Sequence, residues 1–363
     1  MDFSLDNEQL AIRDAVRQLL SSPGRDAGRW AELADMGVLG LRIAPEHGGM
    51  GAGAVETMLV AQELGRANAA EPVIEVAITA AGLIAAAGTA GQQADLLPRI
   101  ADGTLRVVLT ANEPGASWRV RAHGVTAEAT GADGWSLTGV KEPVVVGDTA
   151  DLLLVTALAG EQTRVFVVDP SQQGVTRTGY ETVDGRRAAR IVLDGAAATQ
   201  LGTEPDGLVA LRTAIPFGVA AYAAEALGLM EVMLDITVEY LRSRRQFGAP
   251  LSAQQVLKHR AADMYVSLEL ARSTVQYAAM SLASTRSDPS AATRAKLQTS
   301  IAGRHVGQEA IQLHGGIGMT DEYVLGHYVK RLVALDHVAG DARHQRELLA
   351  RSLTEHTTVD ILA

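Results

Sequence analysis

The sequence contains no cysteine, although it is 363 residues long. This absence excludes disulfide bonds, thiolate zinc sites and a thiol nucleophile, and it is typical of proteins from a reducing compartment. We therefore predict a cytoplasmic protein without a metal site.

Aromatic residues are also scarce, at 4 % of the chain, although hydrophobic residues as a whole reach 47 %. The long stretches rich in alanine and leucine favour packed helices with a mostly aliphatic core over disorder. The formal net charge is −10, and the 32 basic residues form no long run. We therefore do not expect nucleic acid as a partner.

Long uninterrupted apolar runs are missing as well. A membrane span needs roughly 18 consecutive apolar residues. The most apolar segment, residues 208–234, is interrupted by Arg212, Pro216, Glu225 and Glu231. The first twenty residues include four acidic ones and do not start with a basic stretch, unlike a signal peptide. We expect neither a membrane span nor a signal peptide.

Three regions differ in their sequence pattern. Up to residue 105, apolar residues recur at helical spacing, and Asp6 with Gln9 forms a capping-box sequence before the first such stretch. Residues 106–205 show short β-branched runs separated by turn residues. Helical spacing returns from 206 to 363. The pattern predicts an N-terminal helical domain (1–105), a middle β domain (106–205) and a C-terminal helical bundle (206–363). The expected helices of the bundle cover about 208–242, 254–284, 291–313 and 329–353.

Several short motifs accompany this order of domains. They are Asp2-Phe3-Ser4-Leu5 at the first helix, Ala44-Pro45-Glu46 leading to Gly48-Gly49, and Glu63-Leu64-Gly65-Arg66. Together with the order helical, β, helical, they resemble the acyl-CoA dehydrogenase family. The resemblance implies a mainly α fold with a central β-barrel-like domain and a C-terminal four-helix bundle. It also implies FAD as the cofactor.

Two motifs in the bundle carry the resemblance further. Arg244-Arg245-Gln246-Phe247-Gly248, followed by Gln255, resembles the family segment whose arginine reaches the FAD pyrophosphate. Gln312-Leu313-His314-Gly315-Gly316-Ile317-Gly318 resembles a family loop whose glycines let the backbone approach the cofactor. Either motif alone is also typical of an ordinary helix end, with basic residues in the last turn and a glycine cap. Their joint occurrence favours flavin contact, with Arg244, Phe247, Gln255, Gln312, Gly315 and Gly316 as the candidate cofactor-binding residues.

The β domain departs from the family pattern. The stretch that lies over the flavin in family members is recognisable but altered here, as residues 110–117, which end at Ser117. A second family stretch, with an aromatic residue and a threonine beside the flavin ring, aligns with Pro143-Val144-Val145. Because the aromatic ring and the hydroxyl are both missing, the resemblance implies an eroded site for the flavin ring.

The position of the catalytic base departs too. In the family a glutamate removes the α-proton of the acyl thioester. The alignment places Ala339 at its usual position and Gly218 at its alternative position on the first bundle helix. Neither residue can accept a proton, so we predict no catalytic residue in this chain. Asp341, Asp336 and Glu225 are possible substitutes, although for each a solvated or capping role is the more ordinary interpretation.

These departures favour a non-catalytic subunit. In the family each FAD lies across a subunit interface, so this chain would supply the bundle half of the site to a homologous subunit that carries the glutamate. The hypothesis is an α₂β₂ acyl-CoA dehydrogenase that acts on an acyl-CoA, including bulky ones such as steroid side chains, with electron-transfer flavoprotein as the default acceptor. Two alternatives stay open: a self-sufficient flavoenzyme with a base such as Asp341, and a non-enzymatic scaffold or acyl-CoA-binding protein.

Overall fold

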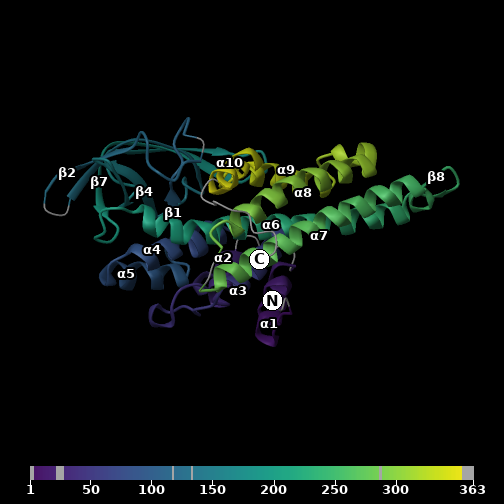
Figure 1. The fold of residues 1–363 in the computed structure, drawn as a ribbon, viewed down its shortest axis with the longest axis horizontal. Helices are drawn as coiled ribbons and strands as arrows, with labels where there is room; N and C mark the ends of the chain where they lie inside the picture. The colour runs from purple at the N-terminus through teal and green to yellow at the C-terminus, as the bar shows by residue number, and fades with distance from the viewer. Residues whose placement is uncertain (1–3, 22–27, 117, 132–133, 286–287, 354–363) are drawn as a thin grey trace.

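A computed structural model describes residues 4–21, 28–116, 118–131, 134–285 and 288–353. Asp2, Phe3 and Ser117 of the motifs above lie outside these residues. Figure 1 shows the β domain at one end of the molecule, the long helices reaching away from it, and the first helices beneath both. The expected fold class, mainly helical with a central β-barrel domain, is confirmed.

The N-terminal region is helical. Its elements are α1 (Asn7–Leu20), α2 (Arg29–Asp35), η1 (Val38–Gly40), η2 (Pro45–His47), α3 (Ala54–Arg66), η3 (Ile74–Ala80), α4 (Ala81–Ala87) and α5 (Ala90–Ala101). The capping box is confirmed, because the Asp6 carboxylate accepts a hydrogen bond from the backbone N–H of Gln9 at 2.9 Å and the Gln9 side chain accepts one in return. The η3 element is a π-helix, a widened turn that often occurs at functional sites.

The middle region forms one closed sheet. Its strands are β1 (Val107–Thr110), β2 (Thr126–Ala129), β3 (Gly134–Val145), β4 (Leu152–Ala159), β5 (Gln162–Val168), β6 (Val175–Glu181) and β7 (Arg187–Gln200). The neighbours run β4, β2, β3, β7 and β5, and β5 pairs back onto β4, which closes the barrel. β1 lies parallel to β4, and β6 lies antiparallel to β7.

A buried ion pair fixes the loop after β1. Lys141 is fully buried and donates hydrogen bonds to Glu113 at 2.7 Å and to Thr156 at 2.9 Å. Glu113 also accepts from the backbone N–H groups of His123 and Gly124. Glu113, a residue of the altered family stretch, thus has a structural role here, because it ties this loop to the barrel.

The C-terminal region contains long helices. They are α6 (Leu208–Ser243), α7 (Gln255–Ala283), α8 (Ala291–His314), α9 (Leu325–His337) and α10 (Ala342–Leu353), with the short hairpin β8 (Arg245–Gln246) and β9 (Ala249–Pro250), and with η4 (Leu251–Ala253) and η5 (Gly315–Met319). The prediction of one last helix over 329–353 is wrong. Ala339 and Gly340 adopt positive φ angles of 58° and 98°, which an α-helix does not accommodate, so α9 and α10 are separate.

The helix α6 runs through the middle of the core. By length and composition it could cross a membrane, but 89 % of its most apolar stretch is buried inside the protein. It packs against α3, α7 and α8, and its alanines, glycines and methionines fill the space between them. This helix is therefore a core helix of the fold.

A buried network of charges joins the three regions. Arg331 of α9 donates two hydrogen bonds to Glu225 of α6, both at 2.8 Å, and a third to Asp184, in the turn between β6 and β7, at 2.9 Å. Arg186 of the same turn pairs with Glu225 at 3.2 Å and donates to the backbone oxygen of Ala69 in the N-terminal region. The network fixes the β domain against both helical regions.

Candidate functional site

A cavity of about 230 Å³ lies where the three regions meet. Gly218 of α6 and Ala339, between α9 and α10, both line it. The two positions implied as alternative sites for a base, far apart in the sequence, therefore belong to one cavity. Its other walls come from η3, from the loop after β1, from β3 and from α10, and they are mostly apolar.

The segment around Ala339 is held tightly. The Gln345 side chain donates to the backbone oxygen of Ala339 at 2.8 Å, and Asp341 caps α10 by accepting from the His344 backbone N–H at 2.8 Å. On the other side, the buried ammonium group of Lys296 donates to the backbone oxygen of Leu335 at 2.9 Å and so satisfies the end of α9. These contacts fix the break between α9 and α10, which forms part of the cavity wall.

The three substitute carboxylates are all engaged elsewhere. Glu225 is only 1 % exposed and is paired with Arg331, which favours its ionised form and lowers its pKa despite burial. The expected solvated or capping role is therefore wrong for Glu225. Asp341 has the expected capping role, and Asp336 accepts from Arg304 at 3.3 Å. None of these three residues is among those that line the cavity.

Lys296 makes the stability of the protein depend on pH. Burial lowers its pKa from 10.5 to about 8, against the smaller opposing effects of Asp336 and Asp341. Between pH 8 and 10.5 the unfolded chain therefore binds more protons than the folded one, so this lysine makes the free energy of unfolding rise with pH. The slope is at most about 1.4 kcal/mol per pH unit.

The variant Lys296→Met lacks this titration. We expect the wild-type protein to gain stability relative to the variant when urea unfolding is measured at pH 9.5 instead of pH 7.5. Because Lys141 titrates in both proteins, its effect cancels in the comparison. If the two proteins differed in free energy of unfolding by the same amount at both pH values, Lys296 would not have the lowered pKa.

The wall of the cavity formed by η3 and α6 carries polar groups that the sequence did not single out. Glu75 accepts a hydrogen bond from the Tyr222 hydroxyl at 2.9 Å, and burial raises the pKa of Glu75. The hydroxyl of Thr79 is buried, and it finds no hydrogen-bond partner within the described part of the chain. No motif marks these residues, so only the fold brings them together at the cavity.

Trp118 lines the cavity from the β domain. Its indole N–H donates to the backbone oxygen of His337 at 2.9 Å, and its ring lies 6.4 Å from the ring of His337 and 5.8 Å from that of His344. Trp118 holds a φ of 56°, which is unusual for a bulky residue. Trp118 therefore attaches the β domain to the break between α9 and α10.

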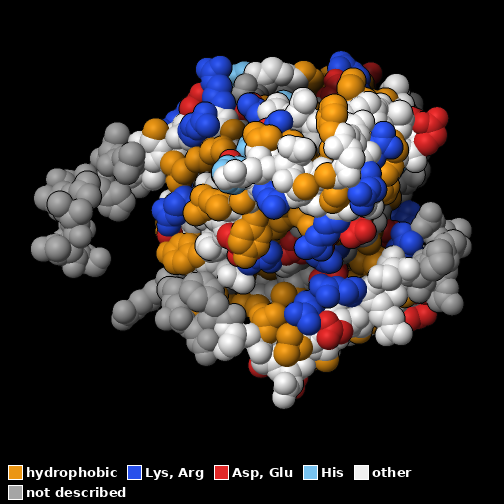
Figure 2. Space-filling model, turned by 90° about the vertical axis from the view of Figure 1, so that its right-hand side faces the viewer, with side chains coloured by type: hydrophobic (Ala, Val, Ile, Leu, Met, Phe, Trp, Pro, Cys, Tyr) orange, Lys and Arg blue, Asp and Glu red, His pale blue; other side chains and the backbone are white. Residues whose placement is uncertain are grey.

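The candidate cofactor-binding residues lie at the opposite end of the bundle. Arg244 is the C-cap of α6, Phe247 occupies the hairpin tip with 93 % of its surface exposed, and Gln255 starts α7. Figure 1 places β8 at the free end of the long helices, away from the β domain. Figure 2 shows that end of the molecule, where basic side chains lie among hydrophobic ones.

The two bundle motifs meet at this end. The ring of His314, at the end of α8, stacks on Tyr240, near the end of α6, with 4.4 Å between the ring centroids. This contact brings the Gly315-Gly316 turn beside the segment that carries Arg244. A Cβ added to either glycine would meet no atom within 4 Å. The glycine turn is therefore open to an approaching group, as the sequence motif implies.

The two halves of an FAD site differ in how well they fit the cofactor. The bundle end offers an exposed arginine, an exposed aromatic ring and an open glycine turn, which suit a pyrophosphate and its adenosine. In the cavity where the three regions meet, Pro143 and Val145 occupy the positions that the family gives to an aromatic ring and a hydroxyl group. We therefore expect this chain to fit the phosphate half of the cofactor better than its ring.

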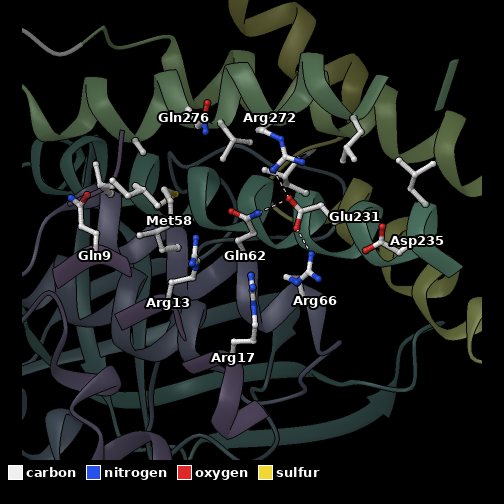
Figure 3. A pocket seen from close by; sticks show the side chains of 18 of the residues that line it. Gln9, Arg13, Arg17, Met58, Gln62, Arg66, Glu231, Asp235, Arg272 and Gln276 are labelled. Atoms are coloured by element: carbon white, nitrogen blue, oxygen red, sulfur yellow. Dashed lines mark hydrogen bonds and ion pairs between the residues drawn. The ribbon is translucent and has the colours of Figure 1, made fainter. Parts of the chain in front are cut away.

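A larger groove, of about 1060 Å³, lies between α1, α3, α6 and α7. Figure 3 shows the side chains of Gln62, Arg66 and Arg272 pointing toward Glu231, which accepts hydrogen bonds from them at 2.5 to 2.7 Å. None of the candidate site residues lines this groove. We therefore do not assign the active site to it.

Known proteins share both the sequence pattern and the fold. Residues 6–104 match the N-terminal domain model of the acyl-CoA dehydrogenases and residues 206–354 match their C-terminal domain model. The acyl-CoA dehydrogenase FadE12 of Mycobacterium tuberculosis is 30 % identical over 348 residues, covering 88 % of this chain and 89 % of FadE12.

Two solved structures of heteromeric or paired proteins are similar over almost the whole chain. A variant of the Tcur3481-Tcur3483 steroid ACAD superimposes with a TM-score of 0.87 at 31 % identity, covering 96 % of this chain and 98 % of that one. The ChsE4-ChsE5 complex from Mycobacterium tuberculosis gives a TM-score of 0.88 at 26 % identity, covering 99 % and 100 %. This chain therefore belongs to the acyl-CoA dehydrogenase family, FAD-dependent oxidoreductases that act on CH–CH groups.

Proposed function

We propose that this chain is the non-catalytic subunit of a heteromeric acyl-CoA dehydrogenase, arranged as α₂β₂. Its bundle end completes the FAD site of a homologous partner, and the partner supplies the glutamate that removes the α-proton. The observation that carries the proposal is the pair Ala339 and Gly218, which line one cavity and offer no proton acceptor at either position.

The surroundings of both positions support this reading. A Cβ added at Gly218 would overlap the hydroxyl group of Thr79, so a glutamate there would require Thr79 to move. The backbone at Ala339 is fixed by Gln345 on one side and by the cap of α10 on the other. Glu225 is ion-paired and Asp341 caps a helix, so neither of these carboxylates has taken over the role. The carboxylate of Glu75 lines the cavity, where it accepts a hydrogen bond from Tyr222.

The bundle end would serve the partner by charge and by shape. Arg244 would hold the pyrophosphate with charge-assisted hydrogen bonds, and Gly315 and Gly316 would let backbone N–H groups approach it. Gln255, Gln312 and Phe247 would complete the contact. When bound, FAD supplies the acceptor for the hydride that leaves the β-carbon of the acyl group.

The relatives support a heteromer and suggest a substrate class. ChsE4 and ChsE5 form a complex, and the Tcur3481-Tcur3483 pair is a steroid ACAD. We extend this to a bulky acyl-CoA as the substrate of the assembly and to electron-transfer flavoprotein as its electron acceptor. In this assembly the bulky acyl group would lie in the partner's own cavity, beside the partner's glutamate.

The proposal is tested by changing Arg244 to alanine in the complex that this chain forms with its partner. Loss of a charge-assisted hydrogen bond costs about 1.5–3 kcal/mol, so we expect FAD to dissociate on the order of 10- to 100-fold more readily. The bound FAD is counted by its visible absorbance after gel filtration. The matched control is Arg242→Ala, which removes an exposed arginine from the same helix end outside both motifs.

Two results would count against the proposal. Unchanged FAD occupancy in the Arg244→Ala complex would favour a scaffold that only retains the fold. A homomer of this chain that binds about one FAD per subunit and is reduced by an acyl-CoA would instead support a self-sufficient enzyme.

A further inference from the structure

One wall of the cavity carries three polar side chains that the proposed role as a non-catalytic subunit does not require. Glu75 and Thr79 lie four residues apart on η3, so they lie on one face of that helix. Tyr222, on α6, faces them and donates its hydroxyl hydrogen to Glu75 at 2.9 Å. All three residues line the cavity, whose remaining walls are largely apolar.

The Thr79 hydroxyl is the unusual member of this group. A buried hydroxyl without a hydrogen bond costs about 1–3 kcal/mol, and buried polar groups nearly always have a partner. Threonine in a helix can bond to the carbonyl oxygen one turn back, but in the described chain the Thr79 oxygen has no partner of any kind. Its oxygen faces Gly218 of α6 and has almost no accessible surface. A rotation of the Thr79 side chain would turn the hydroxyl toward the cavity, where a bound molecule would supply the missing partner.

We propose that Glu75, Thr79 and Tyr222 make this cavity select a compact acyl group that carries a hydroxyl substituent. A hydroxyl group has one hydrogen to donate and two lone pairs to accept. The substituent would donate to the carboxylate of Glu75, whose other contact is with Tyr222, and would accept from Thr79. The apolar walls, including Val108, Val219 and Ile215, would surround the hydrocarbon part.

The size of the cavity suits a small acyl group. About 230 Å³ corresponds to on the order of eight water volumes, which is room for a single ring or a short chain. The inference rests on the acyl-CoA chemistry of the family and does not depend on whether this chain is catalytic. It concerns binding, so it can fail while the FAD and rate measurements still support the heteromer.

The test compares two coenzyme A thioesters that differ in one oxygen atom: cyclohexanecarbonyl-CoA and 4-hydroxycyclohexanecarbonyl-CoA. Their affinities for the full chain, in the assembly in which it purifies, are measured by calorimetry. A hydrogen-bonded hydroxyl group in a polar wall gives on the order of five- to tenfold tighter binding. We expect the wild-type protein to bind the hydroxylated thioester more tightly by this factor. In Thr79→Val the ratio of the two affinities should fall to about one.

A matched control separates this role from a structural one. Thr213→Val removes a hydroxyl from the exposed side of α6, outside the cavity, and should leave the preference unchanged. Because Thr79 has no partner to lose, Thr79→Val should not lower the unfolding temperature. Equal affinities for the two thioesters in the wild-type protein would overturn the proposal. A preference that survives Thr79→Val, or a lower unfolding temperature without any change in preference, would also overturn it.

Discussion

Replacement of Arg331 by methionine is expected to lower the free energy of unfolding by about 3–5 kcal/mol, the usual cost of removing one partner from a buried ion pair. Arg331 is 3 % exposed and makes three hydrogen bonds, two to Glu225 and one to Asp184. Without it, two buried carboxylates would share Arg186 alone, at 3.2 and 3.8 Å. Urea unfolding of the wild-type and variant proteins measures the loss.

The surface pair Lys330 and Asp321 provides the control. Lys330 neighbours Arg331 on α9, and it contacts Asp321 at 2.8 Å with the two side chains 45 % and 80 % exposed. Exposed ion pairs contribute about 0–1 kcal/mol because water and salt screen them, so Lys330→Met should change stability little. Similar losses in both variants would show that the network at Arg331 does not join the domains as described.

Local features of the fold were the easiest to predict from the sequence. The capping box of Asp6 and Gln9 and the start of α8 at Ala291 depend on neighbouring residues, and both agree with the structure. The break at Ala339 was missed because nothing in the apolar spacing of 329–353 interrupts a helix. It depends on distant groups, the ammonium of Lys296 and the amide of Gln345, which hold the chain ends in place.

In the candidate site, too, local features could be predicted from the sequence and long-range contacts could not. The motifs around Arg244 and Gly315 could be read from the sequence because each is contiguous. The ion pairing of Glu225 with Arg331 spans 106 residues, and the bond between Tyr222 and Glu75 spans 147. Because such contacts depend on how whole domains pack, residue spacing alone suggested a solvated role for Glu225 and gave no role to Glu75. The boundaries of the three domains remain predictions.

A second large effect is expected on the rate of the assembled enzyme. A positioned general base contributes about 10²- to 10⁴-fold to the rate of proton transfer. We expect a change of the partner's catalytic glutamate to glutamine to reduce kcat of the complex by this factor. In this chain, Asp341 is the nearest candidate in sequence to the empty base position. Asparagine caps helices as well as aspartate does, so Asp341→Asn should keep α10 intact and leave kcat unchanged.

The comparison of these two variants tests most directly whether the partner, and not this chain, carries the base. The measurement is kcat of the purified complex with one acyl-CoA substrate, after FAD occupancy and unfolding temperature have been matched across the proteins. The account predicts a loss of about 10²- to 10⁴-fold for the partner's variant and no loss for Asp341→Asn. A large loss for Asp341→Asn, with an active complex remaining after the partner's change, would contradict it.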